Sequence, residues 1–177
     1  MFPPLLRRAL DLDKPVELKS LFEGDPPSAI RILRYCLVET LSTGGAAMDC
    51  YVHEDDHAFR TLMWIPSHGP LGTWYEFVPP PFETGLRIMR MLRARTHGKQ
   101  RQHGYTRGSI RCRWQNAVHK FSVEWPHAWE LRIFFGPERP ARLPYTLFPT
   151  GRILPPEHDI RPRSAYGPWI GSENPPA

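Results

Sequence analysis

The sequence predicts an α+β fold in which helices pack on one face of a mostly antiparallel sheet. Two stretches place apolar residues three and four positions apart, which is the period of an amphipathic helix. Two groups of three segments have the apolar or alternating pattern of strands, and their short connections favour antiparallel pairing. The expected order is helices, three strands, one helix and three strands, which is typical of the α+β class.

The N-terminal half is expected to contain three helices and three strands. Residues 4–22 predict two short helices, of which the second is capped by Asp13 and has Pro15 in its first turn. A longer helix over 28–42 ends at Gly44, because glycine reaches left-handed conformations without steric cost. The predicted strands are 47–53, 58–65 and 72–78.

The C-terminal half is expected to contain one helix, three strands and a tail. The helix is predicted over 83–95, and a polar loop over 96–107 follows it. The strands are predicted at 110–114, 118–125 and 129–135. The region 137–177 holds 10 of the 21 prolines, which lack an amide hydrogen and fix φ, so an extended tail is expected. The domain boundaries that follow are 1–27 for an N-terminal helical segment, 28–136 for the α+β domain and 137–177 for the tail.

Composition restricts the class of protein. The chain has 177 residues, of which 41% are hydrophobic and 23% charged, as in an ordinary globular protein. Its three cysteines form an odd, widely spaced set, unlike a secreted disulfide framework. No run of about twenty apolar residues is present, and the first residues do not resemble a signal peptide. We therefore expect a cytoplasmic protein without a membrane span.

Positive charge is concentrated in one part of the sequence. The formal net charge is +5, yet residues 84–123 contain ten basic residues and no acidic one. Such a stretch attracts an acidic protein surface or a polyanion, unless it is simply a solvated face. The predicted partner-binding residues lie on and after the 83–95 helix: Arg87, Arg90, Arg93 and Arg95.

One group of residues has the chemistry of a metal site. Cys50, His53 and His57 follow one another at short spacing, and thiolate and imidazole are ligands of zinc. On a strand, however, Cys50 and His53 point to opposite faces because their spacing is odd, and no second cysteine pair is present. We expect no metal site here.

Catalytic motifs are not found in the sequence. It contains no phosphate-binding G-x-x-x-x-G-K-[ST], no G-x-S-x-G and no H-E-x-x-H. Eight histidines and the thiols of Cys36 and Cys112 are present, but nothing pairs an acid with a base. We expect a non-catalytic protein without catalytic, cofactor-binding or metal-binding residues. A basic nucleic-acid-binding domain with aromatic stacking platforms is the alternative, and a small molecule inside the core is a third hypothesis.

Several segments, taken in order, resemble the PAS-like domain that precedes the motor domain of type II secretion and type IV pilus assembly ATPases. Residues 47–54 (AMDCYVHE) resemble the family's A-S-D-I-H-I-E-P, and residues 87–91 (RIMRM) resemble R-I-K-V-M. Residues 101–104 (RQHG) resemble P-Q-D-G. Residues 118–127 resemble V-D-x-R-V-S-T-L-P-T with Pro126 at the proline. The resemblance covers about 28–135.

The resemblance implies a PAS-like fold and the role of an adaptor in a secretion or pilus assembly. It also shows departures. The histidine and glutamate of the family signature are Tyr51 and His53 here, and only Arg60 remains of the three arginines in R-x-R-x-R. The motor-domain motifs are not in the sequence. We therefore expect an interaction module without ATP hydrolysis, whose partner is an acidic protein surface.

Overall fold

The computed structural model describes residues 9–53, 57–102, 105–127, 129–141 and 160–163. For Leu18, His53, Gln102, His127 and residues 160–163 it describes the backbone alone. No helix in this part of the chain is long and apolar enough to cross a membrane.

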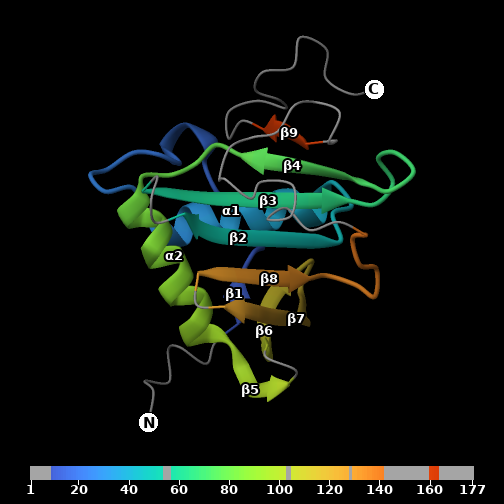
Figure 1. Ribbon diagram of the computed structural model, residues 1–177. Coiled ribbons are helices and arrows are strands. Elements are labelled where there is room, and N and C mark those ends of the chain that lie inside the picture. Colours follow the sequence, from blue (N-terminus) through green and yellow to red (C-terminus); the bar gives the residue numbers. More distant parts are fainter. Residues whose placement is uncertain (1–8, 54–56, 103–104, 128, 142–159, 164–177) are drawn as a thin grey trace.

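The strands form one mostly antiparallel sheet, so the predicted α+β class is confirmed (Figure 1). The strand order is β1-β6-β7-β8-β2-β3-β4-β9, and β5 pairs with β6. Only β1 with β6 and β4 with β9 are parallel pairs. The strands are β1 (Leu10–Asp11), β2 (Ala47–His53), β3 (Ala58–Ile65), β4 (Thr73–Phe77), β5 (His97–Gln102), β6 (Tyr105–Trp114), β7 (Ala117–His127), β8 (Glu130–Phe134) and β9 (Ile160–Arg163).

Both helices pack on the same face of the sheet, which we call the helix face. They are α1 (Ala29–Ser42) and α2 (Phe82–Arg95). Their buried side chains form one core with those of Met48, Cys50 and Val52 on β2. Figure 1 shows α1 behind the central strands and α2 crossing their ends. The alternating residues of β2, Ala47, Asp49 and Tyr51, point to the opposite face because successive side chains alternate.

That opposite face, which we call the second face, carries a smaller aromatic core. Trp64 of β3, Trp74 of β4 and Phe134 of β8 are each 5% exposed. The Trp64 indole donates a hydrogen bond to the carbonyl of Leu71 at 3.2 Å. The guanidinium of Arg139 lies 3.9 Å from the centre of the Phe134 ring.

Most elements predicted from periodicity lie where they were expected. The helix predicted over 28–42 is α1, and the one over 83–95 is α2. Strands were expected at 47–53, 58–65 and 72–78, and β2, β3 and β4 occupy these positions. The turn after β6 has positive φ at Gln115 and Asn116, as a tight turn between antiparallel strands requires.

Two predictions about local structure are wrong. Within residues 9–22, the structure has strand β1 and a three-residue 3-10 helix, Leu18–Ser20, where we expected helices. Asp13 therefore caps no helix; its carboxylate accepts hydrogen bonds from the amides of Gln115 and Asn116 at 2.6 and 2.9 Å. The predicted polar loop over 96–107 holds β5 and the start of β6, because pairing with the neighbouring strand satisfies its polar backbone.

The predicted tail is described only in part. Residues 137–141 contain no helix or strand, and β9 pairs with the edge of β4. The prediction of an extended, proline-rich conformation otherwise concerns residues 142–159 and 164–177, which lie outside the described residues.

Candidate functional site

The predicted partner-binding arginines lie on or beside the part of α2 that faces away from the core. Thr84, Gly85, Ile88, Met89 and Leu92 are the buried side of this helix. Gly85 permits a close approach, because a Cβ at this position would lie 2.2 Å from atoms of the Phe59 side chain. The helix is therefore pressed onto β3, and its opposite side remains available to solvent.

The structure divides the four arginines into two sets. Arg87 and Arg90 are exposed on the outer side of α2, and Arg93 is half-buried beside them. None of these three forms an ion pair with any described residue. The outer surface of α2, which we define by Arg87, Arg90 and Arg93, thus carries positive charge that no described acidic side chain pairs.

Arg95 belongs to a different site. It lines a shallow cavity of about 400 Å³ together with Asp11, Lys14 and Arg34. Arg34 donates hydrogen bonds to the carbonyls of Asp11, at 2.7 Å, and of Lys14, so it fastens the N-terminal segment to α1. Burial lowers the pKa of Arg95. The prediction that Arg95 shares a surface with Arg87 and Arg90 is therefore not supported by its position.

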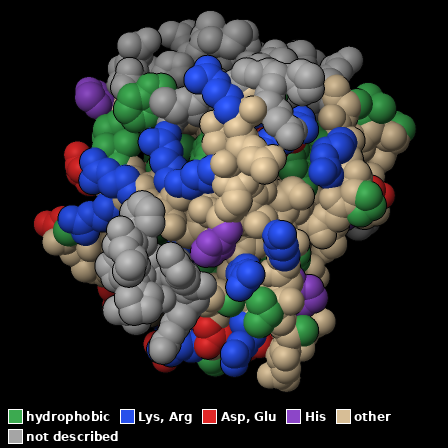
Figure 2. All heavy atoms as spheres, turned by 90° about the horizontal axis from the view of Figure 1, so that it is seen from below, with side chains coloured by type: hydrophobic (Ala, Val, Ile, Leu, Met, Phe, Trp, Pro, Cys, Tyr) green, Lys and Arg blue, Asp and Glu red, His purple; other side chains and the backbone are tan. Residues whose placement is uncertain are grey.

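Basic side chains are spread over the end of the molecule where β5 and the C-terminal end of α2 lie. Figure 2 shows Lys and Arg more frequently than Asp and Glu on this side, without one continuous patch. The acid-free sequence 84–123 explains this distribution, because it runs through α2, β5, β6 and most of β7. Because α2 lies on the helix face while alternate side chains of β6 and β7 point to the second face, one sequence stretch supplies separate basic surfaces.

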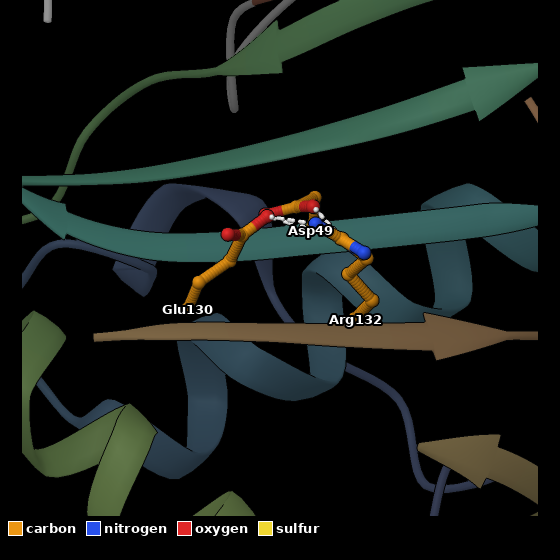
Figure 3. A network of polar contacts seen from close by, with 3 residues as sticks. All are labelled: Asp49, Glu130 and Arg132. Carbon is orange, nitrogen blue, oxygen red and sulfur yellow. Dashed lines mark hydrogen bonds and ion pairs between the residues drawn. The ribbon is translucent and has the colours of Figure 1, made fainter. Parts of the chain in front are cut away.

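A buried ionic network on the second face is the largest feature that the sequence analysis missed. Arg132 of β8 donates from Nε to Asp49 Oδ2 at 3.1 Å and from Nη2 to Glu130 Oε1 at 3.0 Å (Figure 3). One strand away, Arg60 donates to the two carboxylate oxygens of Glu76 at 2.7 and 3.2 Å. A signal was present, since alternation in β8 places Glu130, Arg132 and Phe134 on one face.

The charges of this network are balanced when Asp49 holds a proton. Burial raises the pKa of Asp49 well above its usual value, and the carboxylate of Glu130 raises it further, while Arg132 opposes both effects. Asp49 Oδ1 is buried and accepts no hydrogen bond from any residue that the structure describes. With Asp49 neutral, the guanidiniums of Arg60 and Arg132 face the two carboxylates of Glu76 and Glu130. The network is thus an internal structural element.

Arg60 is part of this interior. Arg60 stands at the first arginine position of the segment that resembles R-x-R-x-R. Its side chain is 9% exposed and forms a bidentate pair with Glu76, and its Nη1 lies 3.4 Å from the hydroxyl of Tyr51. Burial raises the pKa of Tyr51 to about 12, so the phenol stays protonated at neutral pH.

The sequence matches no model of a known protein family and no curated protein.

The cysteines and the residues of the metal-like sequence lie apart. Cys50 is buried on the helix face, and burial raises its pKa and that of Cys112 to about 12. His57 is exposed, and its ring packs against the edge of Phe82. No group of three metal-binding side chains occurs among the residues that the structure describes. The side chain of His53 lies outside that description.

The aromatic residues proposed as stacking platforms for nucleic acid are mostly interior. Trp64, Trp74, Tyr75 and Trp125 are buried, and Trp114 is half-buried. Trp129 alone among these six is exposed, at 42%. These rings pack against other side chains, and a base can stack only on an accessible ring.

Proposed function

We propose that this protein is a non-catalytic interaction module that binds an acidic protein surface through the outer surface of α2. The observation that carries the proposal is the exposure of Arg87 and Arg90 without an ion pair to any described residue. Exposed charges that are not used internally are free to steer and orient a partner of opposite sign.

The proposal includes a role similar to that of the N-terminal domain of secretion and pilus assembly ATPases. It rests on the collinear sequence resemblance over about 28–135, together with the cytoplasmic location expected from the cysteines. The order of α1, three strands, α2 and further strands is compatible with it. The buried thiols and the internal use of Arg60 favour a binding role over catalysis, because a catalytic group must reach its substrate.

The experiment that tests this proposal is charge reversal on α2. The full chain, immobilised, captures its partner from a lysate of its own cells, and the purified partner is then titrated against variants. We expect R87E/R90E to weaken binding by at least tenfold. Lys19→Glu, at an exposed lysine of the 3-10 helix, is compared with R90E alone, because both change the charge by two units, and it should leave binding unchanged. Full affinity of R87E/R90E, or hydrolysis of ATP by the purified chain, would contradict the proposal.

Binding of nucleic acid is the alternative function. The ten basic residues without an acidic neighbour in the sequence favour it, whereas the buried aromatic rings do not. This alternative would be favoured if the chain bound an oligonucleotide more tightly than the protein partner. The affinity for the oligonucleotide should then fall steeply as the salt concentration rises.

A further inference from the structure

The β6–β7 hairpin carries a second basic surface, on the face of the sheet opposite to the helices. Ile110 and Cys112 of β6 and Phe121 and Val123 of β7 point into the core of the helix face. The residues that alternate with them therefore point the other way. We define the hairpin surface by the exposed residues Arg111, Arg113, Val118 and Lys120.

Two like charges lie directly opposite each other in this surface. Arg111 and Lys120 are cross-strand partners in the antiparallel register of β6 and β7. Facing side chains in such a pair interact directly, and like charges in these positions are destabilising. Arg113 adds a third positive charge two residues further along the same strand.

The same hairpin also contains a cross-strand pair of opposite charges. Arg107 and Glu124 are also cross-strand partners, and Arg107 Nε lies 3.3 Å from Glu124 Oε1. Both pairs project from the same face, since 107 and 111 differ by an even number. One pair is therefore stabilised by opposite charges, and the other retains a repulsion that a single acidic residue would remove.

No described acidic side chain forms an ion pair with Arg111, Arg113 or Lys120, and the carboxylate nearest the turn, that of Asp13, accepts its hydrogen bonds from the amides of Gln115 and Asn116. Asp11 of β1 is in register with Arg113, yet no ion pair joins it to Arg111, Arg113 or Lys120. Val118 contributes an apolar side chain that is 58% exposed. A surface with three cations and one exposed apolar side chain fits an acidic polypeptide segment that also carries an apolar residue.

We propose that the hairpin surface is a second docking surface, which binds an acidic polypeptide segment. It is separate from the outer surface of α2, because α2 packs on the helix face and these residues point from the second face. An acidic segment relieves the repulsion between Arg111 and Lys120 on binding. An acidic peptide is favoured over nucleic acid because the rings of β7, Phe121 and Trp125, are buried on the opposite face, which leaves no stacking platform in the hairpin surface. Two docking surfaces on opposite faces would allow the protein to bridge two partners.

The test uses Lys120→Glu in the full chain that already carries R87E/R90E, so that the hairpin surface is measured alone. Lys120→Glu creates a second Arg–Glu cross-strand pair, and we expect the melting temperature to rise by about 1–4 °C. Affinity for a fluorescent ten-residue glutamate peptide with one central leucine should fall by about three- to tenfold. Lys120→Gln should give smaller changes in the same directions.

Lys19→Glu is the control, because it changes the net charge equally at an exposed lysine outside the hairpin. We expect it to leave the melting temperature and the peptide affinity unchanged. A lower melting temperature for Lys120→Glu would overturn the argument from repulsion. A peptide affinity equal to that of the Lys19→Glu chain would overturn the docking surface. Tighter binding of a single-stranded oligonucleotide of equal charge would overturn the class of partner. Because α2 is already altered in this background, these outcomes are independent of the α2 proposal.

Discussion

Arg132 donates a hydrogen bond to Asp49 across β8 and β2, over 3.1 Å, and the two side chains are only 6% and 1% exposed. Charged groups that are removed from water to this degree need partners, because the interior solvates them poorly. Arg132 meets this need by contacting Glu130 as well, so one guanidinium holds two carboxyl groups together. The contact between Arg132 and Asp49 joins the two halves of the sheet at its centre, where β8 and β2 pair.

Removal of Arg132 should therefore cost far more than replacement of Asp49 by asparagine. In Arg132→Met the buried carboxyl groups lose their cation, and we expect a loss of about 3–5 kcal/mol in the free energy of unfolding. Asp49→Asn retains a neutral hydrogen-bonding side chain and should cost less than about 1 kcal/mol. Urea unfolding monitored by tryptophan fluorescence measures both values. Equal losses in the two variants would show that Asp49 is ionised in the native protein.

The stability of the protein should also depend on the proton of Asp49. Its pKa is raised by burial and by Glu130, so above the ordinary value of 3.8 the native state binds this proton more tightly than the unfolded chain does. The contribution of the Asp49 proton to the free energy of unfolding is fully present below pH 3.8. It is lost as the pH rises through the native pKa. Relative to Asp49→Asn, the wild type should lose up to about 1.4 kcal/mol per pH unit in this window.

The measurement is the difference in unfolding free energy between wild type and Asp49→Asn at several pH values from 4 to 8. Other titrating groups cancel in this difference if they do not couple to Asp49. A difference that stays constant over the range would contradict a raised pKa.

Periodicity was sufficient to predict the elements that bury one face. Leu33 and Leu37 in α1, and Ile88 and Leu92 in α2, repeat at helical spacing, and both helices form where this repeat lies. The first residues behave differently. Leu10 and Leu12 alternate as in a strand, but only pairing with β6 reveals which conformation is stable, because two-residue strands have little local preference.

The sequence was sufficient to predict which basic residues the candidate site contains, but not how they are arranged in space. The arginines of α2 share one helix, but the direction of Arg95 depends on the approach of α1 and the N-terminal segment, which bring Arg34 and Lys14 beside it. The opposition of Arg111 and Lys120 follows from the register of β6 and β7, which the turn at Gln115 and Asn116 determines. The buried network needed the strand order, since Asp49 and Arg132 are 83 residues apart.

The thiols should be inert in the folded protein. Burial raises the pKa of Cys50 and Cys112 to about 12 and that of Cys36 well above its usual value, so the reactive thiolate is rare at neutral pH. Native protein at pH 8 should react with a thiol reagent at least a hundredfold more slowly than protein in 6 M guanidinium, in which all three cysteines react. Rapid labelling of one cysteine in the native state would contradict this expectation.

Gly85 should be the residue that sets the distance between α2 and the sheet. A methyl group at this position would lie 2.2 Å from the side chain of Phe59, which is completely buried. Gly85→Ala should therefore lower the free energy of unfolding by about 1–3 kcal/mol through overpacking, although alanine is the better helix former. Gly136→Ala is the matched control, because no atom lies within 4 Å of its added Cβ. If both variants unfold at the same urea concentration, the contact with Phe59 does not hold α2 in place, and the position of Arg87 and Arg90 must have another origin.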